Sequence, residues 1–389
     1  MSDQPHRPFV ECRCDGSPHE MGIQQGRALR RKISGVRLCL RDLEAFRSEQ
    51  PHWLPYPLFL RLAEARYERA LLPALQRIAP SMLARLQGIA AGSGLPLRSL
   101  CLMNAMEAFL SSMEGKTIAM PLGACSAVAV RGSHSENGEP IVAKNFDYIP
   151  LVQPFFILRE CQPRHGWRSL EFAVAPQAGA VDGVNEKGLC ITLNYAFATD
   201  AGSPAPLISM AISEALAKCA SVTEAVDCIV RQPRWGAGIL MLADASGDLA
   251  SLELTSTRAA IRRSEAGQNW LLFTNVCCCP ETRAVQVPEG AIYSDGVPTA
   301  LRGMPVLRWH ADRARRLEAL VRAKKPIDSN GLAAIMSDHG PAGRPDGASP
   351  CVHTNYWRTT ASLQWFPVRR SVRVSYSAAC EADYVEVVL

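Results

Sequence analysis

The sequence predicts an α+β protein whose first third is helical and whose remainder is built mainly of strands. Apolar residues recur at three- and four-residue spacing in 20–43 and again in 67–91, and a Gly-Ser-Gly turn at 92–94 ends the second run. From Cys125 onward short apolar runs replace this period, with a few helical stretches among them. Strands and helices do not alternate regularly, which argues against a doubly wound fold.

The individual elements can be assigned in chain order. Residues 18–115 are expected to be helical. The apolar runs 126–131 and 140–146 flank Asn137-Gly138, and Asn-Gly between such runs is the strongest short-range signal for a β-hairpin. Further strands are expected at 170–175, 188–193, 239–242, 250–254, 270–273, 360–365 and 373–376, and further helices at 207–230, 306–323 and 331–336. The loop-like stretches 199–206 and 340–350 are too short for interdomain linkers, so one compact body is predicted.

Composition excludes several classes of protein. The 389 residues are 48% hydrophobic and 20% charged, which is typical of a globular chain. The net charge of +5 comes from 42 Lys and Arg against 37 Asp and Glu without a dense basic block, so nucleic acid is not an expected partner. The sequence contains no 18-residue apolar run and no apolar segment near its first residue, which predicts neither a membrane span nor a signal peptide. A cytoplasmic location is expected.

The fourteen cysteines are not spaced as metal ligands or disulfide partners usually are. No CxxC pair occurs, Cys277, Cys278 and Cys279 are consecutive, and the others are scattered. We therefore expect reduced thiols, no metal and no resident cofactor. The phosphate-binding, dinucleotide-binding, serine-hydrolase and zinc-protease motifs GxxxxGK[ST], GxGxxG, GxSxG and HExxH are also missing.

The predicted hairpin brings a thiol and a carboxylate together. If Asn137 and Gly138 are the central turn residues, Asp147 faces residue 128 and Cys125 faces residue 150, so Asp147 ends near Cys125. Such a pair fits a nucleophile with an orienting group, provided that something lowers the thiol pKa from about 8.5. His134 lies at the turn, too far away to be the base at about 3.3 Å per strand residue. The alternative is a buried structural cysteine with a strand-end aspartate.

Several phrases in the same order resemble a known family. They are Cys125 followed by Ala143-Lys144-Asn145-Phe146-Asp147-Tyr148, then Gly183-Val184-Asn185-Glu186-Lys187-Gly188-Leu189-Cys190 running into Leu193-Asn194-Tyr195, and finally Phe273-Thr274-Asn275. They resemble the N-terminal-nucleophile (Ntn) hydrolases, among them the choloylglycine hydrolases and, more closely, the acyl-coenzyme A:6-aminopenicillanate acyltransferase family (peptidase C45-like). That family is also similar at the opening phrase 16–22 and at the chain end 380–386.

The resemblance implies a four-layer αββα sandwich with a helical N-terminal pro-segment. It also implies self-cleavage between Ala124 and Cys125, which would separate a pro-segment, 1–124, from a catalytic part, 125–389. The freed α-amine of Cys125 would then serve as the base. An α-amino group titrates near 7.7–8.0, which suits this role without a histidine.

The resemblance also suggests roles for individual residues. Cys125 matches the nucleophile, and Asp147 the carboxylate that hydrogen-bonds the freed amine or thiol. Asn194 and Asn275 match asparagines that can flank the tetrahedral oxyanion, although either could be an ordinary turn or strand-end residue. Lys144 stands where choloylglycine hydrolases have an arginine, and a lysine cannot form a bidentate fork.

Three further positions can be compared with the pattern of the same family. Ala124, rather than glycine, precedes the nucleophile, which would slow self-cleavage if the attacked carbonyl must sit in a strained turn. Arg313, in the expected helix 306–323, is the nearest candidate for an arginine that the family carries late in the chain. Asp338-His339 also resembles a family phrase, for which a structural role is expected.

The leading functional prediction is cleavage or exchange of an acyl group on an N-acyl amide through a Cys125 thioester. Water as the acceptor makes an amidohydrolase, and an amine makes an acyltransferase whose donor is an acyl-coenzyme A or acyl-carrier-protein thioester. An alternative is an unprocessed, non-catalytic scaffold of the same fold. A redox protein using Cys277–Cys279 is the least favoured, because adjacent cysteines form strained disulfides. The oligomeric state is left open.

Four apolar residues are candidates for the walls of a substrate pocket. Met120 and Leu122 lie between the helical third and the nucleophile, and Phe155 and Phe156 follow the hairpin. If they line the acyl site, the preferred acyl group is apolar and medium-sized. The alternative is that these residues pack in the core.

Overall fold

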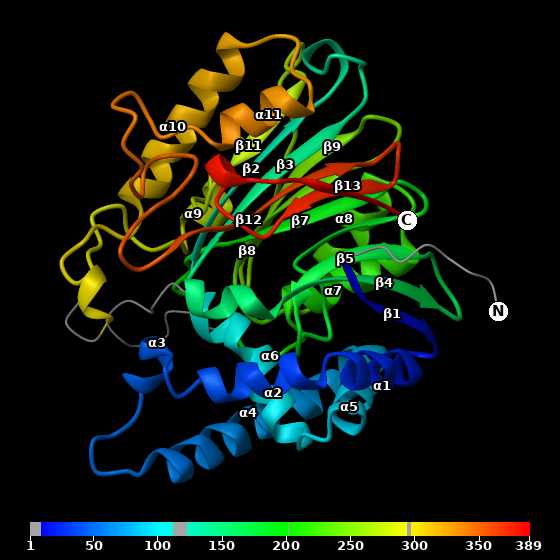
Figure 1. Cartoon of the computed structure of the whole chain (residues 1–389), viewed down its shortest axis with the longest axis vertical. Helices are drawn as coiled ribbons and strands as arrows, with labels where there is room; N and C mark the ends of the chain where they lie inside the picture. Colours follow the sequence, from blue (N-terminus) through cyan, green and yellow to red (C-terminus); the bar gives the residue numbers. More distant parts are fainter. Residues whose placement is uncertain (1–8, 112–122, 201, 294–296) are drawn as a thin grey trace.

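The computed structural model describes residues 9–111, 123–200, 202–293 and 297–389, and two β-sheets form its centre (Figure 1). One sheet has eight strands, in the spatial order β1 (Val10–Gly16), β4 (Phe156–Pro163), β5 (Ser169–Val174), β6 (Asp182–Asn185), β7 (Cys190–Tyr195), β8 (Gly238–Ala243), β9 (Leu249–Leu254) and β10 (Ala259–Arg262). The other has six, in the order β11 (Trp270–Phe273), β2 (Gly123–Val130), β3 (Ile141–Tyr148), β12 (Arg358–Phe366), β13 (Ser371–Ser375) and β14 (Val385–Val388).

Helices cover the outer face of each sheet. Helices α7 (Ile208–Lys218) and α8 (Val222–Arg231) pack on strands of the larger sheet, and α10 (Arg308–Ala323) and α11 (Ser329–Met336) pack on β2, β3 and β11. The inner faces meet where β2 contacts β7 and β8. The layers are therefore helix, sheet, sheet, helix, which confirms the predicted αββα sandwich. A short helix, α9 (Pro280–Arg283), lies beside β10.

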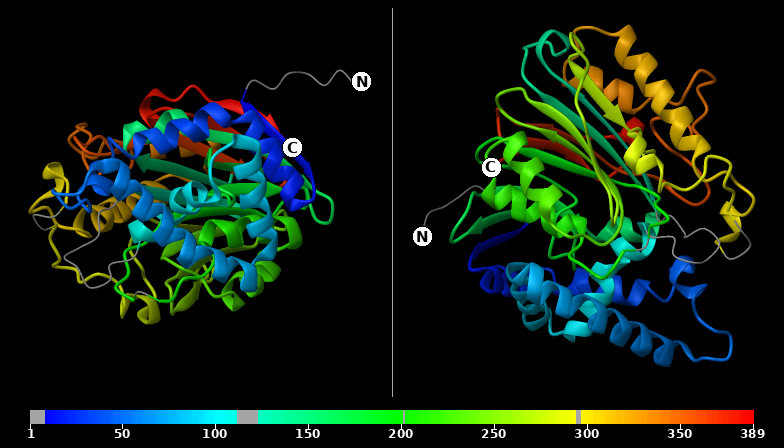
Figure 2. Two further views of the ribbon diagram at one scale, coloured as in Figure 1. Left: turned by 90° about the horizontal axis from the view of Figure 1, so that it is seen from below. Right: turned by 180° about the vertical axis from the view of Figure 1, so that it is seen from behind.

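The N-terminal helices gather at one end of the sandwich (Figures 1 and 2). They are α1 (Pro18–Ala28), α2 (Arg30–Cys39), α3 (Glu44–Arg47), α4 (Tyr56–Ile78), α5 (Pro80–Ser93) and α6 (Leu97–Ser111). A capping box starts α1: the Ser17 hydroxyl accepts from the Glu20 backbone, and the Glu20 carboxylate accepts from the Ser17 backbone. The backbones of helices α1 and α5 are in contact. A Cβ atom added at Gly22 would lie only 2.2 Å from the Arg85 carbonyl oxygen, so the close approach depends on glycine there. None of the described helices is long and apolar enough to cross a membrane.

Sequence reasoning missed β1, β4, β6, β10 and β14. Strand β1 extends the larger sheet by pairing in parallel with β4. Its burial alternates, with Cys12 and Cys14 buried and the charged residues Glu11, Arg13 and Asp15 partly or fully exposed, but the strand is short and polar overall. The apolar run of β4 is interrupted by Arg159, which is buried against Glu171 at 2.6 Å on the neighbouring strand. A buried ion pair of this kind conceals a strand from a hydrophobicity pattern.

The predicted hairpin exists, but its predicted register was wrong. Asp147 pairs with Ala124 and Cys125 pairs with Phe146, not with residues 128 and 150. The ladder ends at Val130 and Ile141, because residues 131–140 form turns of their own, among them the 3₁₀ turn η1 (Gly132–His134), and also bond to Asn269 and Ile327. A ten-residue connection replaces the two-residue turn. The observed register places Asp147 directly opposite the Ala124–Cys125 peptide bond.

Candidate active site

Cys125 lies near the start of β2 and is fully buried between the sheets. Its backbone N–H donates to Asn275 Oδ1 at 2.9 Å. Burial raises the pKa of the Cys125 thiol to about 12, and the charge of Lys144 opposes this only in part. In the uncut chain the thiol is therefore protonated near neutral pH and needs a base before it can act as a nucleophile.

Asp147, on β3, is buried beside this strand segment. Its Oδ1 accepts a hydrogen bond from Thr359 Oγ1 at 2.6 Å, and its Oδ2 lies 3.6 Å from Arg313 Nη1. Burial raises the pKa of Asp147, whereas the charge of Arg313 and the Thr359 hydroxyl lower it. Both carboxylate oxygens thus face groups from other elements, which fixes the carboxylate's orientation next to the Ala124–Cys125 bond.

Arg313, on α10, connects most of the groups in this site. Its Nη2 donates to Asn275 Oδ1 at 3.1 Å and to the Cys125 carbonyl oxygen at 3.4 Å. Its Nη1 donates to the Gly347 carbonyl oxygen at 3.1 Å. Nη2 also lies 2.9 Å from His310 Nδ1, which must accept because a guanidinium has no acceptor. Burial and the arginine charge hold the pKa of His310 well below its usual value, so this imidazole is neutral.

The two predicted asparagines approach Cys125 in different ways. Asn275 follows β11 and holds the Cys125 nitrogen through Oδ1, while its Nδ2 donates to the Tyr195 carbonyl oxygen at 2.7 Å. Asn194, on β7, donates from Nδ2 to the Thr274 carbonyl oxygen at 3.0 Å. Its buried Oδ1 has no hydrogen-bond partner among the described residues. An oxyanion role for either side chain stays a prediction.

Lys144 lies on β3 near Cys125 but bonds elsewhere. Its Nζ donates to Asp182 Oδ1 at 2.5 Å and to the Leu193 carbonyl oxygen at 2.6 Å, and both ionic side chains are completely buried. The ammonium therefore acts on Cys125 through its charge. A buried lysine charge without Asp182 would destabilise the folded chain, so each of the two buried charges needs the other.

Three contributors to this site were not singled out from the sequence: Asp182, His310 and Thr359. Asp182 immediately precedes the Gly-Val-Asn phrase at 183–185, and a carboxylate beside an apolar strand was a usable signal. Thr359 reaches Asp147 only because β12 pairs with β3 more than 200 residues away along the chain. No local pattern encodes such a contact.

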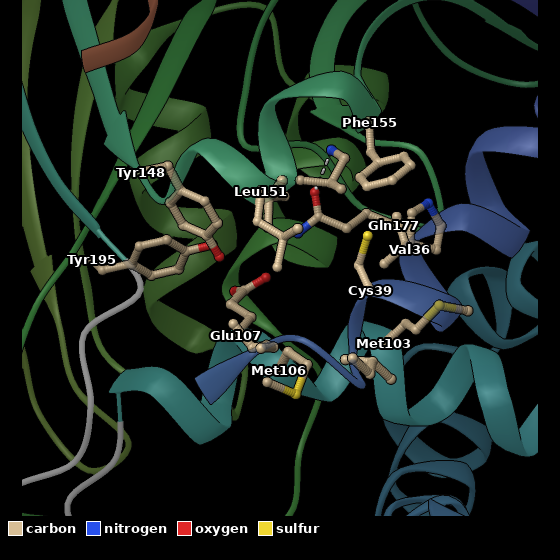
Figure 3. A pocket seen from close by; sticks show the side chains of 15 residues that line it. Val36, Cys39, Met103, Met106, Glu107, Tyr148, Leu151, Phe155, Gln177 and Tyr195 are labelled. Carbon is tan, nitrogen blue, oxygen red and sulfur yellow. Dashed lines mark hydrogen bonds between the residues drawn. The ribbon is translucent and has the colours of Figure 1, made fainter. Parts of the chain in front are cut away.

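A cavity that is partly open to solvent lies between the N-terminal helices and the sandwich (Figure 3). Its lining is mostly apolar: Val36, Cys39, Leu40, Leu43, Met103, Met106, Leu151, Val152, Phe155, Val174 and Pro176. Of the predicted pocket residues, Phe155 lines it. Phe156 instead packs in the core against Phe146 and Phe172. Met120 and Leu122 lie outside the described residues.

Polar groups gather on one side of this cavity. Figure 3 shows Glu107, Tyr148 and Tyr195 pointing toward one another there. Burial raises the pKa of Glu107 to about 7, although its carboxylate accepts a hydrogen bond from the Ser209 backbone at 3.0 Å. Tyr148 follows Asp147 directly, and the Tyr195 carbonyl oxygen is the acceptor of Asn275. The two tyrosines thus join the cavity to the surroundings of Cys125.

Comparison with known families agrees with the resemblance seen in the sequence. Residues 133–288 match the profile of the family described as "Acyl-coenzyme A:6-aminopenicillanic acid acyl-transferase". The match includes Lys144, Asp147, Asn194 and Asn275, and it begins after Cys125. The match confirms the resemblance seen in the sequence over residues 133–288. No protein of curated function matches the chain.

Solved structures similar to this one come from several organisms. An ortholog of N-acylethanolamine-hydrolyzing acid amidase from Caenorhabditis elegans has a TM-score of 0.43 and 14% identity, covering 63% of this chain and 93% of its own. Penicillin V acylase from Agrobacterium tumefaciens has a TM-score of 0.44 and 16% identity, covering 68% and 86%. A variant of conjugated bile acid hydrolase from Clostridium perfringens has a TM-score of 0.40 and 16% identity, covering 68% and 97%. Identities this low say nothing about the substrate.

Proposed function

We propose that this protein is a self-activating Ntn enzyme that cleaves or transfers the acyl group of an N-acyl amide through a thioester on Cys125. The observation that carries this proposal is the placement of the Cys125 nitrogen, which is held by Asn275 Oδ1 at 2.9 Å while Asp147 pairs with the preceding residue. A cleavage before Cys125 would turn that nitrogen into an amine already positioned by its neighbours. The match to an acyltransferase family supports the class of reaction.

Self-cleavage would proceed by an exchange of bonds at Ala124. The Cys125 sulfur attacks the Ala124 carbonyl carbon, and the thiol proton passes to the peptide nitrogen, which leaves as the free amine and so gives a thioester. Water then hydrolyses the thioester, leaving a carboxylate on Ala124 and a free thiol and amine on Cys125. Because burial raises the thiol pKa to about 12, this first attack is expected to be slow.

Turnover would repeat the same chemistry on a substrate. The freed amine, with a pKa near 7.7–8.0, takes the thiol proton, and the thiolate attacks the acyl carbonyl. The substrate nitrogen takes that proton and leaves as the amine product. Water or an acceptor amine then releases the acyl group from sulfur. Asp147 and Asn275 would orient the amine, and Asn194 would face the oxyanion.

The apolar cavity beside Tyr148 and Tyr195 is the proposed acyl site. Met103 and Met106 on α6 and Phe155 give it walls that adapt to irregular shapes. Each buried methylene contributes about 0.8 kcal/mol, so affinity should rise with acyl length until the cavity is filled. An acyl-coenzyme A or acyl-carrier-protein thioester would enter by the same route if the enzyme acts as a transferase.

The experiment that tests the reaction is trapping of the acyl intermediate. Purified protein is mixed with a panel of N-acyl amides and acyl thioesters, quenched in acid, and the acylated peptide is located by mass spectrometry. We expect the added mass on Cys125. Cys125→Ala should abolish both adduct and turnover, and Cys278→Ala, which removes an exposed thiol, should change neither. Turnover by the Cys125→Ala variant would contradict the proposal.

Acyl specificity is tested separately with the same panel. We expect an optimum at a medium apolar chain, and Met106→Trp, which narrows the cavity, should shift it to shorter chains. A flat response to chain length, or a preference for charged groups such as glutamyl, would show that the acyl group binds elsewhere.

A further inference from the structure

Four side chains with metal-ligating atoms converge outside the active site: His339, Cys351, His353 and Cys380. Their donor atoms all lie within 4.8 Å of one another. The Cys351 sulfur is 3.3 Å from His353 Nε2, and the Cys380 sulfur is 3.5 Å from the same nitrogen. Two thiols and two imidazoles therefore share one small volume.

These distances agree with a tetrahedral centre. With Zn–S bonds of about 2.3 Å and Zn–N bonds of 2.0–2.1 Å, a sulfur and a nitrogen on one tetrahedral ion stand about 3.5 Å apart. The two observed sulfur–nitrogen distances are 3.3 and 3.5 Å. The imidazole rings of His339 and His353 stand edge to face with centroids 5.4 Å apart, so neither ring stacks on the other.

A second observation also indicates a ligand. His339 Nε2 is buried and has no hydrogen-bond partner among the described residues, although an unpaired buried polar atom carries a free-energy cost. The four residues come from separate parts of the fold: His339 follows α11, Cys351 and His353 precede β12, and Cys380 lies in the 3₁₀ turn η4 (Ala379–Glu381).

We propose that His339, Cys351, His353 and Cys380 form a Cys₂His₂ site for a divalent transition metal, with Zn²⁺ as the ion whose ligand preferences fit best. Four protein ligands leave no open position, so the site is structural and the metal takes no part in acyl transfer. The sequence predicts no metal because it contains no CxxC pair. Here the only close pair is Cys351-x-His353, and the other ligands are distant in sequence.

The proposed metal would also support the active site mechanically. Val352 lies between two ligands, and its N–H donates to Thr359 Oγ1 at 2.9 Å. The same hydroxyl donates to Asp147 Oδ1 at 2.6 Å. An ion that fixes Cys351 and His353 therefore fixes the position of Thr359, and through it the orientation of Asp147. Thr359 is a positioning residue in this arrangement.

The test uses metal binding by the full chain and requires no catalytic activity. Reduced protein is dialysed against a chelator, titrated with Co²⁺, and followed by absorption spectroscopy. We expect one Co²⁺ per chain, with thiolate-to-cobalt charge-transfer bands, the intense visible bands of tetrahedral Co²⁺, and displacement by Zn²⁺. Zn²⁺ should also raise the melting temperature of the apo-protein.

Two cysteine variants separate this site from adventitious binding. Cys380→Ser removes an exposed ligand, so the chain should fold, and its affinity should fall by more than the roughly 10–100-fold that loss of an outer-shell partner costs. Cys278→Ser removes another exposed thiol and should bind as the wild type does. Absence of a tetrahedral spectrum, equal binding by Cys380→Ser, or a Cys351–Cys380 disulfide in freshly purified protein kept without added oxidant would each overturn the proposal.

Discussion

The Cys125 region and the His339–Cys351–His353–Cys380 cluster both contain buried sulfur, but their neighbours give it different chemistry. Cys125 faces an orienting carboxylate, an arginine and an asparagine that holds its own backbone nitrogen. Cys351 and Cys380 face imidazole nitrogens instead. In the proposed mechanism the first arrangement would prepare a nucleophile whose base is its own freed amine, and in the proposed metal site the second would supply ligands. The surroundings of a thiol, more than its burial, decide what it can do.

The two regions are also connected. A series of contacts leads from Cys351 to Asp147. The N–H of the neighbouring Val352 donates to the Thr359 hydroxyl, and that hydroxyl donates to the Asp147 carboxylate. The Asn145 side chain adds a second link by donating to the carbonyl oxygens of Met336 and Pro350 at 2.8 and 2.9 Å. Changes in the ligand cluster should therefore reach the active site as a shift in Asp147, whereas changes at Cys125 should leave metal binding intact.

Arg313→Met should destabilise the Cys125 region more than the other substitutions described below. Removing one member of a buried ion pair leaves Asp147 as an uncompensated charge, which typically costs about 3–5 kcal/mol of unfolding free energy. Arg315→Met is the matched control, because Arg315 lies on the exposed face of the same helix against Asp312 and should change stability by about 0–1 kcal/mol. Urea denaturation measures both. Equal stability of the two variants would mean that Arg313 does not hold the Cys125 region together.

Asp147→Asn should fold and lose most of its activity. The change preserves shape but removes the negative charge that would orient the freed amine, and a loss of roughly 10²–10³-fold is expected, comparable with removal of one oxyanion donor. Asp248→Asn, at a surface ion pair with Arg263, serves as the control in the same turnover assay. Full activity in a folded Asp147→Asn protein would make this carboxylate a strand-end cap.

Glu107→Gln should give a smaller, pH-dependent gain in stability. Burial raises the pKa of Glu107 from 4.5 to about 7, so the folded chain holds this proton more tightly than the unfolded chain. The wild type therefore loses stability as the pH rises from 4.5 to about 7 and does not regain it above that range. The variant's melting temperature should equal the wild type's below pH 4.5 and exceed it above pH 7. The same gain at both ends of the range would exclude the carboxyl's titration as the cause.

Local patterns predicted the parts of this molecule that depend on nearby residues. The Asn137-Gly138 signal located the hairpin and so brought Asp147 toward Cys125, although the register was wrong because residues 131–140 form turns of their own and bond to Asn269 and Ile327 instead of extending the ladder. Thr359 could not be predicted, because its contact needs the pairing of β3 with β12. The ligand cluster was missed for the same reason: its members meet only after α11, the loop before β12 and η4 are assembled.

Arg313 combines a feature that nearby residues predict with a contact that they do not. The sequence placed it in the correct helix, since the apolar period of 306–323 is recovered in α10. Nothing in that period says that this face of the helix meets β2 and β3, where the guanidinium reaches Asp147 and the Cys125 carbonyl oxygen. Helix packing on the sheet, a long-range feature, completes the site.

The intact mass of freshly expressed protein shows whether the chain cleaves itself at Cys125. We expect the wild type to separate into two chains, 1–124 and 125–389, the second beginning with Cys125. Cys125→Ala should remain one full-length chain, and Cys125→Ser should be cleaved more readily than it turns over substrate, because a hydroxyl can attempt the rearrangement but is the poorer nucleophile near neutral pH. A wild-type protein that stays in one piece would favour an unprocessed scaffold, and normal cleavage of Cys125→Ala would contradict the assignment of Cys125 as the nucleophile.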